Sequence, residues 1–284
     1  MSAARPPEGA RSVAAGEGTP ASRTALLRLT DARLSLAGRS FGPFTLSLRA
    51  GETVAILGPS GAGKSSLLKL IAREHRLAGG SIMLDGRPLQ HWPAAELAQR
   101  RAVLPQTGAV AFGLPVSLVV ALGRVSRASD PAQERIVRDA LVQARAEHLA
   151  ERRFDTLSGG EQARVQLARV FAQAWDAREG LLLVDEPLAA LDPGLALELM
   201  EAMQRFARER GHALVAVLHD LTTALNHFER LWLLAEGRIR ADCGAVPAAL
   251  PLLEQLYGVR LRLLRDAEGL AIVAGSARVA ERAA

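Results

Sequence analysis

The chain has 284 residues, of which 49% are hydrophobic and 4% aromatic, and its formal net charge is +5. This length can bury the core of one large domain, or of one domain with an inserted subdomain, but not of two catalytic domains. The single cysteine, Cys243, excludes an internal disulfide and a cysteine-rich metal site. The basic residues are scattered and aromatic residues are few, so the charge indicates a solvated surface rather than a nucleic-acid platform.

Residues 1–24 predict a disordered tail, because they are rich in Pro, Gly, Ser and Ala and contain no apolar segment of signal-peptide length. We therefore expect the protein to stay in the cytoplasm. The longest uncharged run, residues 108–123, is too short for a bilayer span and is broken by Pro115. Any membrane association is expected to come through a partner.

Strands are predicted at the start of the folded region. Alternating apolar residues at 25–36 and 44–48 indicate two half-buried strands joined by a turn at 37–39. Thr53–Leu57 is a continuous apolar run typical of a buried parallel strand, and a Gly-rich loop and a helix over 64–72 follow it. Two further short strands are expected at 81–84, before a tight turn at Asp85 and Gly86, and at 101–104.

A helical insert is predicted from about residue 107 to 157. Pro131 is expected at the first position of a helix that Ser129 or Asp130 caps. Helical spacing relates the apolar residues Ile136, Val137, Ala140, Leu141 and Ala144. Beyond the insert, strands at 181–184 and 213–218 flank a helix at 194–208, as in a parallel βαβ unit, and weak alternation over 259–273 is consistent with a hairpin.

A loop rich in glycine follows the strand Thr53–Leu57. It reads Gly58, Pro59, Ser60, Gly61, Ala62, Gly63, Lys64, Ser65 and Ser66. The spacing and the strand–loop–helix context are those of a phosphate-binding P-loop, whereas the motif alone would leave a chance turn open. Glycines let backbone N–H groups turn toward phosphate oxygens, and the helix N-terminus adds partial positive charge. We expect Lys64 on the β- and γ-phosphates and the Ser65 hydroxyl on Mg²⁺.

Two carboxylates, Asp185 and Glu186, end the predicted strand 181–184. Ligands of α/β sheets lie outside the carboxyl ends of the strands, so Asp185 is expected to hold Mg²⁺ and Glu186 to orient the attacking water. A second anion site is indicated where Leu157-Ser158-Gly159-Gly160-Glu161-Gln162 precedes a helix, because free N–H groups lie there.

With these motifs in place, the sequence resembles the ATPases of ABC transporters, whose signature is LSGGQ. The resemblance implies that Ser158, Gly159 and Gly160, together with Asp192 of the D-loop, bind the nucleotide of the opposite subunit. It also implies that Gln106 touches Mg²⁺ and answers to a permease, and that His219 is the switch histidine near the γ-phosphate. These motifs follow the family's order from Gly58 to His219, which weighs against coincidence.

Two positions depart from the family's pattern. Leu36 stands where an aromatic residue usually stacks on adenine, so base stacking is weak or Phe41 substitutes. The D-loop reads Leu188-Ala189-Ala190-Leu191-Asp192, without the two hydroxyl side chains that are usual there.

The resemblance implies an α/β fold: a P-loop ABC-type core with an antiparallel β subdomain and an inserted helical subdomain. We expect a tail at 1–24, the ATPase domain at 25–262 and a C-terminal tail, with a possible hairpin, at 263–284. Local similarity at 101–124, 174–180, 217–221 and 256–259 points to the haem importer ATPases of bacteria, with siderophore and cobalamin importers as alternatives.

ATP and Mg²⁺ are the cofactors that the resemblance implies. The expected partners are a second copy of the chain, two copies of a permease and, indirectly, a periplasmic haem-binding protein, at the cytoplasmic face of the inner membrane. Permease contact is expected around residues 108–124, chiefly at Phe112 and Leu114. Two other functions are less well supported. An ABC-type ATPase that acts on nucleic acid usually has a second cassette or a coiled-coil insert, and this sequence has neither. An inactive cassette that serves as a scaffold would not need Lys64 and Glu186, which are both intact.

Overall fold

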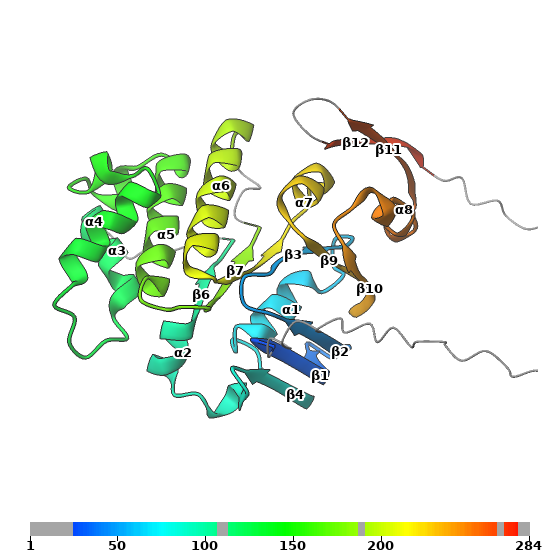
Figure 1. Cartoon of the computed structure of the whole chain (residues 1–284), viewed down its shortest axis with the longest axis horizontal. Helices are drawn as coiled ribbons and strands as arrows, with labels where there is room; N and C mark the ends of the chain where they lie inside the picture. Colours follow the sequence, from blue (N-terminus) through cyan, green and yellow to red (C-terminus); the bar gives the residue numbers. More distant parts are fainter. Residues whose placement is uncertain (1–24, 107–112, 187–190, 266–269, 278–284) are drawn as a thin grey trace, which may run out of the picture.

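The computed structural model describes residues 25–106, 113–186, 191–265 and 270–277 (Figure 1). The predictions for the tail, for Phe112 and for the D-loop residues 188–190 lie outside these residues. Within them, the predicted α/β class is confirmed.

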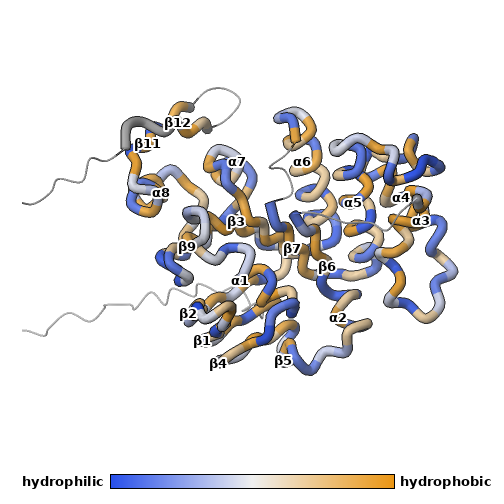
Figure 2. Tube along the Cα trace, turned by 180° about the vertical axis from the view of Figure 1, so that it is seen from behind, coloured by the Kyte–Doolittle hydropathy of each residue, from blue (hydrophilic) through white to orange (hydrophobic). Residues whose placement is uncertain are grey.

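A six-stranded sheet forms the centre of the molecule, in the order β10-β9-β3-β8-β7-β6. Its strands are β3 (Thr53–Leu57), β6 (Arg101–Leu104), β7 (Leu181–Asp185), β8 (Ala213–Val217), β9 (Arg230–Ala235) and β10 (Arg238–Gly244). All are parallel except β10, which pairs antiparallel with β9. The β3, β7 and β8 residues are all buried, and Figure 2 shows hydrophobic segments concentrated in the central strands. The continuous apolar runs of the sequence therefore predicted these strands correctly.

An antiparallel sheet lies beside the central one, in the order β2-β1-β4-β5. It consists of β1 (Leu27–Leu36), β2 (Arg39–Leu48), β4 (Gly79–Leu84) and β5 (Arg87–Pro88). Helix α1 (Lys64–Ile71) packs its apolar residues against both sheets. The expected start of β2 at residue 44 was five residues too late. Leu36 pairs with Arg39 and Leu34 with Phe41, but the exposed Arg39 and Ser40 hide this pairing from a hydrophobicity pattern.

The described part of the insert consists of helices and 3₁₀ turns joined by loops, as predicted. Helices α3 (Val116–Ala121) and α4 (Gln133–Gln143) pack on α5 (Gly159–Ala174), which returns the chain to the central sheet (Figure 1). The five apolar residues predicted to share a face are all buried. Short 3₁₀ turns complete the chain: η1 (Leu89–His91), η2 (Leu122–Arg124), η3 (Glu147–Leu149), η4 (Phe154–Thr156) and η5 (Pro247–Ala249).

The predicted cap of the α4 helix was wrong. The helix begins at Gln133 rather than at Pro131, and Ala132 occupies the cap position without a side-chain bond. Asp130 instead accepts hydrogen bonds from the buried guanidinium of Arg124, which also binds Asp176 and the carbonyl of Ala172. A buried charge requires such partners, and the ion pair takes the carboxylate that the cap would have used.

The remaining helices and a hairpin complete the fold. They are α2 (Ala94–Arg100), α6 (Pro193–Arg210), α7 (Leu221–His227), α8 (Leu250–Tyr257), and the antiparallel pair β11 (Val259–Arg265) and β12 (Leu270–Ala277). The expected βαβ unit is confirmed as β7–α6–β8. Strand β11 runs across residue 262, where the ATPase domain was expected to end. Among the described helices, none combines the length and apolar character needed to cross a membrane.

A buried histidine joins the ends of two central strands. His212 precedes β8, and its Nδ1 accepts a hydrogen bond of 2.8 Å from the N–H of Gly180, which precedes β7. The acceptor role requires the neutral imidazole, with its proton on Nε2. Burial and the nearby Arg210 charge lower the pKa of His212 from 6.5 to about 4. Between pH 6.5 and about pH 4, His212 is therefore protonated in the unfolded chain but not in the folded one. The free energy of unfolding consequently falls as the pH falls through this range.

We predict that the free energy of unfolding drops by about 2 kcal/mol through this one group between pH 7 and pH 5. The substitution His212→Asn keeps an acceptor for the Gly180 N–H but cannot be protonated there. It should flatten this part of the stability profile, measured by chemical denaturation at each pH. An unchanged slope in His212→Asn would assign the pH dependence to other groups.

Candidate functional site

The Gly-rich loop follows β3 and leads into α1, as predicted. Two of its glycines have no room for a side chain. A Cβ on Gly58 would lie 2.0 Å from the carbonyl oxygen of Leu234, and a Cβ on Gly63 would lie 2.7 Å from the ring of Phe41. Gly63 also has φ +99°, a conformation that side chains rarely adopt. The glycines are thus required by the packing of the loop as well as by its turns.

Lys64 is buried at the mouth of this loop, with 5% of its surface exposed. Its Nζ donates hydrogen bonds to the carbonyl oxygens of Gly58 at 2.9 Å and Pro59 at 3.1 Å. Burial lowers the pKa of Lys64 from its usual value, and the Glu186 and Asp185 carboxylates partly offset that shift. The loop therefore holds a cation against two of its own carbonyl oxygens, near the carboxylates of Asp185 and Glu186.

Asp185 lies at the carboxyl end of β7 and is almost fully buried. Its Oδ1 accepts a hydrogen bond of 2.8 Å from the hydroxyl of Ser65, the second residue of α1. The fold thus places together a hydroxyl and a carboxylate that lie 120 residues apart in the sequence. Oxygen donors of this kind are the ones that Mg²⁺ prefers.

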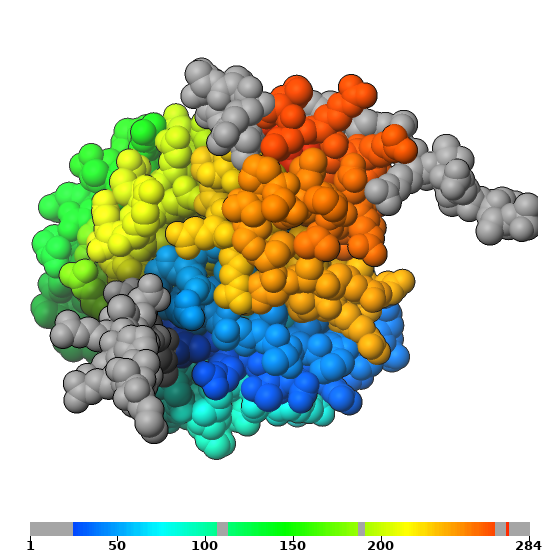
Figure 3. Space-filling model, turned by 45° about the vertical axis from the view of Figure 1, so that its right-hand side comes forward, coloured from blue at the N-terminus to red at the C-terminus, as the bar shows by residue number. Residues whose placement is uncertain are grey.

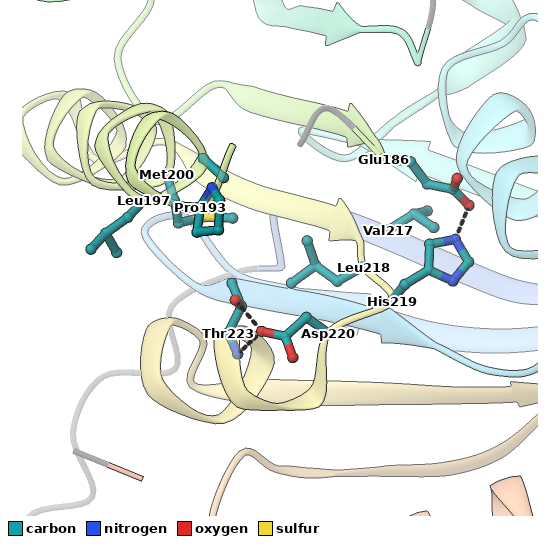
Figure 4. A pocket seen from close by; sticks show the side chains of 10 residues that line it. Glu186, Pro193, Leu197, Met200, Val217, Leu218, His219, Asp220 and Thr223 are labelled. Atoms are coloured by element: carbon teal, nitrogen blue, oxygen red, sulfur yellow. Dashed lines mark hydrogen bonds and ion pairs between the residues drawn. The ribbon is translucent and has the colours of Figure 1, made fainter. Parts of the chain in front are cut away.

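Glu186 lies next to this pair and connects the residues that follow two strands of the central sheet, β6 and β8. Its Oε2 accepts a hydrogen bond of 2.9 Å from the side-chain amide of Gln106, just beyond β6. Its Oε1 lies 2.5 Å from Nε2 of His219, just beyond β8 (Figure 4). Gln106 thus binds Glu186 in this structure, while Ser65 and Asp185 form a separate pair.

A cavity of about 350 Å³ joins the loop to these side chains. Its walls come from the antiparallel sheet, the Gly-rich loop and the ends of β7 and β8: Arg39, Phe41, Ser60, Gly61, Ala62, Gly63, Lys64, Ser65, Ser66, Glu186 and His219. The cavity has the position expected for a bound nucleotide in a P-loop protein. Arg39 was missed by the sequence analysis, because an exposed arginine at a strand end carries no local signal.

Phe41 lines this cavity but is almost fully buried, with its ring against Gly63 and Gly237. The guanidinium of Arg39 lies 5.5 Å from the centre of that ring. Leu36, at the position where the family usually has an aromatic residue, is the cross-strand partner of Arg39 and is exposed. Phe41 therefore supports the loop, and Arg39 and Leu36 lie at the open edge.

A second cavity, of about 290 Å³, extends from Glu186 and His219 between α6 and α7 (Figure 4). Its walls are mainly apolar, from residues such as Leu197, Met200 and Leu218. Asp220 at its rim caps α7 by accepting hydrogen bonds from the backbone N–H groups of Thr222 and Thr223. The cap fixes the start of α7 directly after His219.

The signature segment forms a capping box at the start of α5. The Ser158 hydroxyl accepts a bond from the N–H of Glu161, and the Glu161 carboxylate accepts one from the N–H of Ser158. Gly159 has open space around it, so its backbone can be approached from outside. Asp192 caps α6 through the N–H of Leu195. Among the described residues, none of the signature segment or Asp192 lines the cavity at the Gly-rich loop.

Comparison with known proteins supports this assembly of motifs. Residues 41–189 match the family model described as ABC transporter. The Hemin import ATP-binding protein HmuV of Pseudomonas aeruginosa is 47% identical over 195 residues, which cover 68% of this chain and 76% of that protein. The protein of the same name from Myxococcus xanthus is 42% identical over 235 residues, covering 80% of this chain and 87% of its own length.

Solved structures share the fold. The ATP-binding subunit of an ABC transporter superposes with a TM-score of 0.70 at 25% identity and covers 82% of this chain and 98% of its own. A dimeric ATP-binding cassette in a post-hydrolysis state, bound to ADP and Pi, has a TM-score of 0.67 at 23% identity and covers 78% and 99%. From its motifs, its site geometry and these similarities, the chain belongs to the ABC transporter family, as one of its ATP-binding, ATP-hydrolysing proteins.

Proposed function

We propose that this chain is the motor subunit of an importer that carries haem across the bacterial inner membrane. The observation that carries the proposal is the 42–47% identity to proteins named for hemin import, over two thirds or more of both chains. The site described above is a nucleotide site and does not identify the cargo, so the cargo is proposed from this similarity alone. Siderophore and cobalamin importers are the alternatives that a transport experiment separates.

The residues at the loop fit magnesium-bound ATP. Backbone N–H groups from Ser60 to Ser66 and the ammonium group of Lys64 would hold the phosphates. Ser65 and Asp185 present adjacent oxygens that would hold Mg²⁺, with Gln106 as a further oxygen donor if it leaves Glu186. The metal would neutralise charge on the phosphates.

Glu186 is the proposed base of the hydrolysis. Its carboxylate is held on one side by Gln106 and on the other by His219, at the ends of three parallel strands. A carboxylate fixed in this way can orient a water molecule toward the γ-phosphate and accept its proton. When its contact with Glu186 is broken, His219 would donate a hydrogen bond to the γ-phosphate.

We propose further that two copies enclose two ATP molecules. The signature residues Ser158, Gly159 and Gly160, and Asp192, do not line the cavity of their own chain. They are nevertheless arranged as an anion site, because Gly159 is open at the start of α5. A second chain, turned about a two-fold axis, would bring that site to the first chain's nucleotide.

We propose that the permease contact lies on the insert, on other side chains than those expected from the sequence. Phe112 lies outside the described residues, and Leu114 is partly buried against the core, so a charge there would disturb the fold. Leu118 and Leu122, one helical turn apart, are 47% and 44% exposed, and Val125 beyond them is also exposed. We call these three residues the insert ridge, and we propose that it contacts the permease at the cytoplasmic face of the membrane.

We predict that Glu186→Gln retains magnesium-ATP binding but lowers kcat for hydrolysis at least about 100-fold, because the amide cannot accept the proton of the water. The variant should accumulate as an ATP-bound dimer in size-exclusion chromatography. In bacteria that depend on this chain, it should abolish growth on haem as sole iron source while growth on a ferric siderophore continues.

Hydrolysis at the wild-type rate in this variant would refute the role of Glu186. If the variant instead loses growth on the ferric siderophore and keeps growth on haem, the cargo is a siderophore. The matched control is Glu179→Gln, which neutralises an acid ahead of β7 and should leave hydrolysis and growth unchanged.

For the insert ridge, we predict that Leu122→Asp keeps ATP affinity within about twofold but releases the subunit from its permease, because a charge on an apolar contact must be desolvated. Co-purification with the permease from membranes measures this. Val142→Asp is the control, since Val142 is 51% exposed on a different helix of the insert, α4. If Leu122→Asp still co-purifies and supports uptake, the ridge is not the contact.

A further inference from the structure

A tyrosine near the C-terminal end of the chain reaches the start of the phosphate loop. The backbone N–H of Gly58 donates a hydrogen bond of 3.0 Å to the hydroxyl oxygen of Tyr257, 199 residues away in the sequence. Gly58 is packed tightly, because a Cβ there would collide with the carbonyl of Leu234 in β9. The tyrosine therefore provides a hydrogen-bond acceptor for the Gly58 N–H, at the tightly packed point where the chain leaves β3.

Helix α8 holds this tyrosine in place. Tyr257 is its last residue, Gly258 ends the helix in the left-handed conformation, and Leu253 is fully buried one turn earlier. Burial raises the pKa of the Tyr257 hydroxyl, while the bond from Gly58 partly opposes that shift. The hydroxyl is therefore neutral at physiological pH and its oxygen is fixed as an acceptor.

The segment that follows α8 is anchored at a second point near the site. The backbone N–H of Ile272 in β12 donates a bond of 3.1 Å to the hydroxyl of Thr222, in the first turn of α7. Figure 3 shows the orange to red-orange residues of this segment gathered at one side of the molecule, above the golden-yellow residues that precede them in the chain. Helix α8 thus contacts the start of the phosphate loop, and strand β12 contacts the helix that begins after His219.

Gly58 is held from two directions. Its N–H donates a hydrogen bond to the Tyr257 hydroxyl, and its carbonyl oxygen accepts a hydrogen bond of 2.9 Å from the ammonium group of Lys64. Rotation of Gly58 would move that carbonyl, and with it the position from which Lys64 must reach a phosphate. Fixing the N–H therefore fixes the geometry of the loop before any nucleotide arrives.

We propose that Tyr257 is a positioning residue for nucleotide binding, acting through Gly58 on the phosphate loop. The inference rests on the role proposed above for that loop. Tyr257 is not expected to touch the nucleotide, since Gly58 lies between them in the chain's path from β3 to α1. Its contribution is to keep the loop in the conformation that binds phosphate, which affects affinity more than the chemical step.

The test is Tyr257→Phe, which keeps the ring in α8 and removes only the acceptor oxygen. An unsatisfied buried N–H should weaken the loop, so we expect the Kd for magnesium-ATP to rise about five- to tenfold. The kcat at saturating ATP should stay within about twofold, because Gln106, Glu186 and His219 are untouched. Thr222→Val is the matched control: it removes the other anchor of the C-terminal segment and should leave the Kd unchanged.

A normal Kd in Tyr257→Phe would overturn the inference, even if the thermal midpoint falls, because the tyrosine would then only stabilise the fold. A raised Kd in Thr222→Val of equal size would also overturn it, by tracing the effect to the whole segment. Should Tyr257→Phe fail to fold, hydrogen exchange on the wild-type chain decides: slow exchange at the Gly58 amide supports the inference and fast exchange overturns it. A wild-type chain that bound no ATP would instead refute the proposed function.

Discussion

The buried ammonium group of Lys64 is the interaction on which the site depends. A charge without water must have partners, and here they are two carbonyl oxygens of its own loop, with the carboxylates of Asp185 and Glu186 nearby. The loop can adopt this shape only with glycine at positions such as Gly63, where the ring of Phe41 occupies the space of a side chain. Phosphate oxygens would then replace the carbonyl groups as partners of the lysine.

Parallel pairing brings the rest of the machinery to that lysine. Strands β3, β7 and β8 are neighbours in the sheet and run the same way, so the residues that follow them emerge at one edge. Glu186 and His219 meet there, although 33 positions separate them in the sequence, and Gln106 arrives from β6. In the structure these three side chains form one hydrogen-bonded chain, and Gln106 directly precedes the insert in the sequence. This gives the proposed permease contact a physical route to the site.

The sequence predicted those parts of the structure that depend on local pattern. Buried strands such as Thr53–Leu57 and the helix faces of the insert follow from apolar spacing. The predicted cap of α4 failed because tertiary packing decides it: Asp130 binds the buried guanidinium of Arg124, which also binds Asp176 from beyond α5. The bond between Tyr257 and Gly58 spans most of the chain and has no local signal at either end. The roles of the site residues rest on the resemblance, since the structure gives their arrangement and not their chemistry.

The shared active site is the central claim, and a disulfide trap tests it most directly. Ser60→Cys in the phosphate loop and Ser158→Cys in the signature segment are combined with Glu186→Gln, and Cys243 is replaced by serine so that no other thiol can react. The account predicts a disulfide between two chains that forms with magnesium-ATP and not without nucleotide. Two results would contradict the sandwich: a crosslink that forms equally well without ATP, or no crosslink in a sample in which ATP is bound.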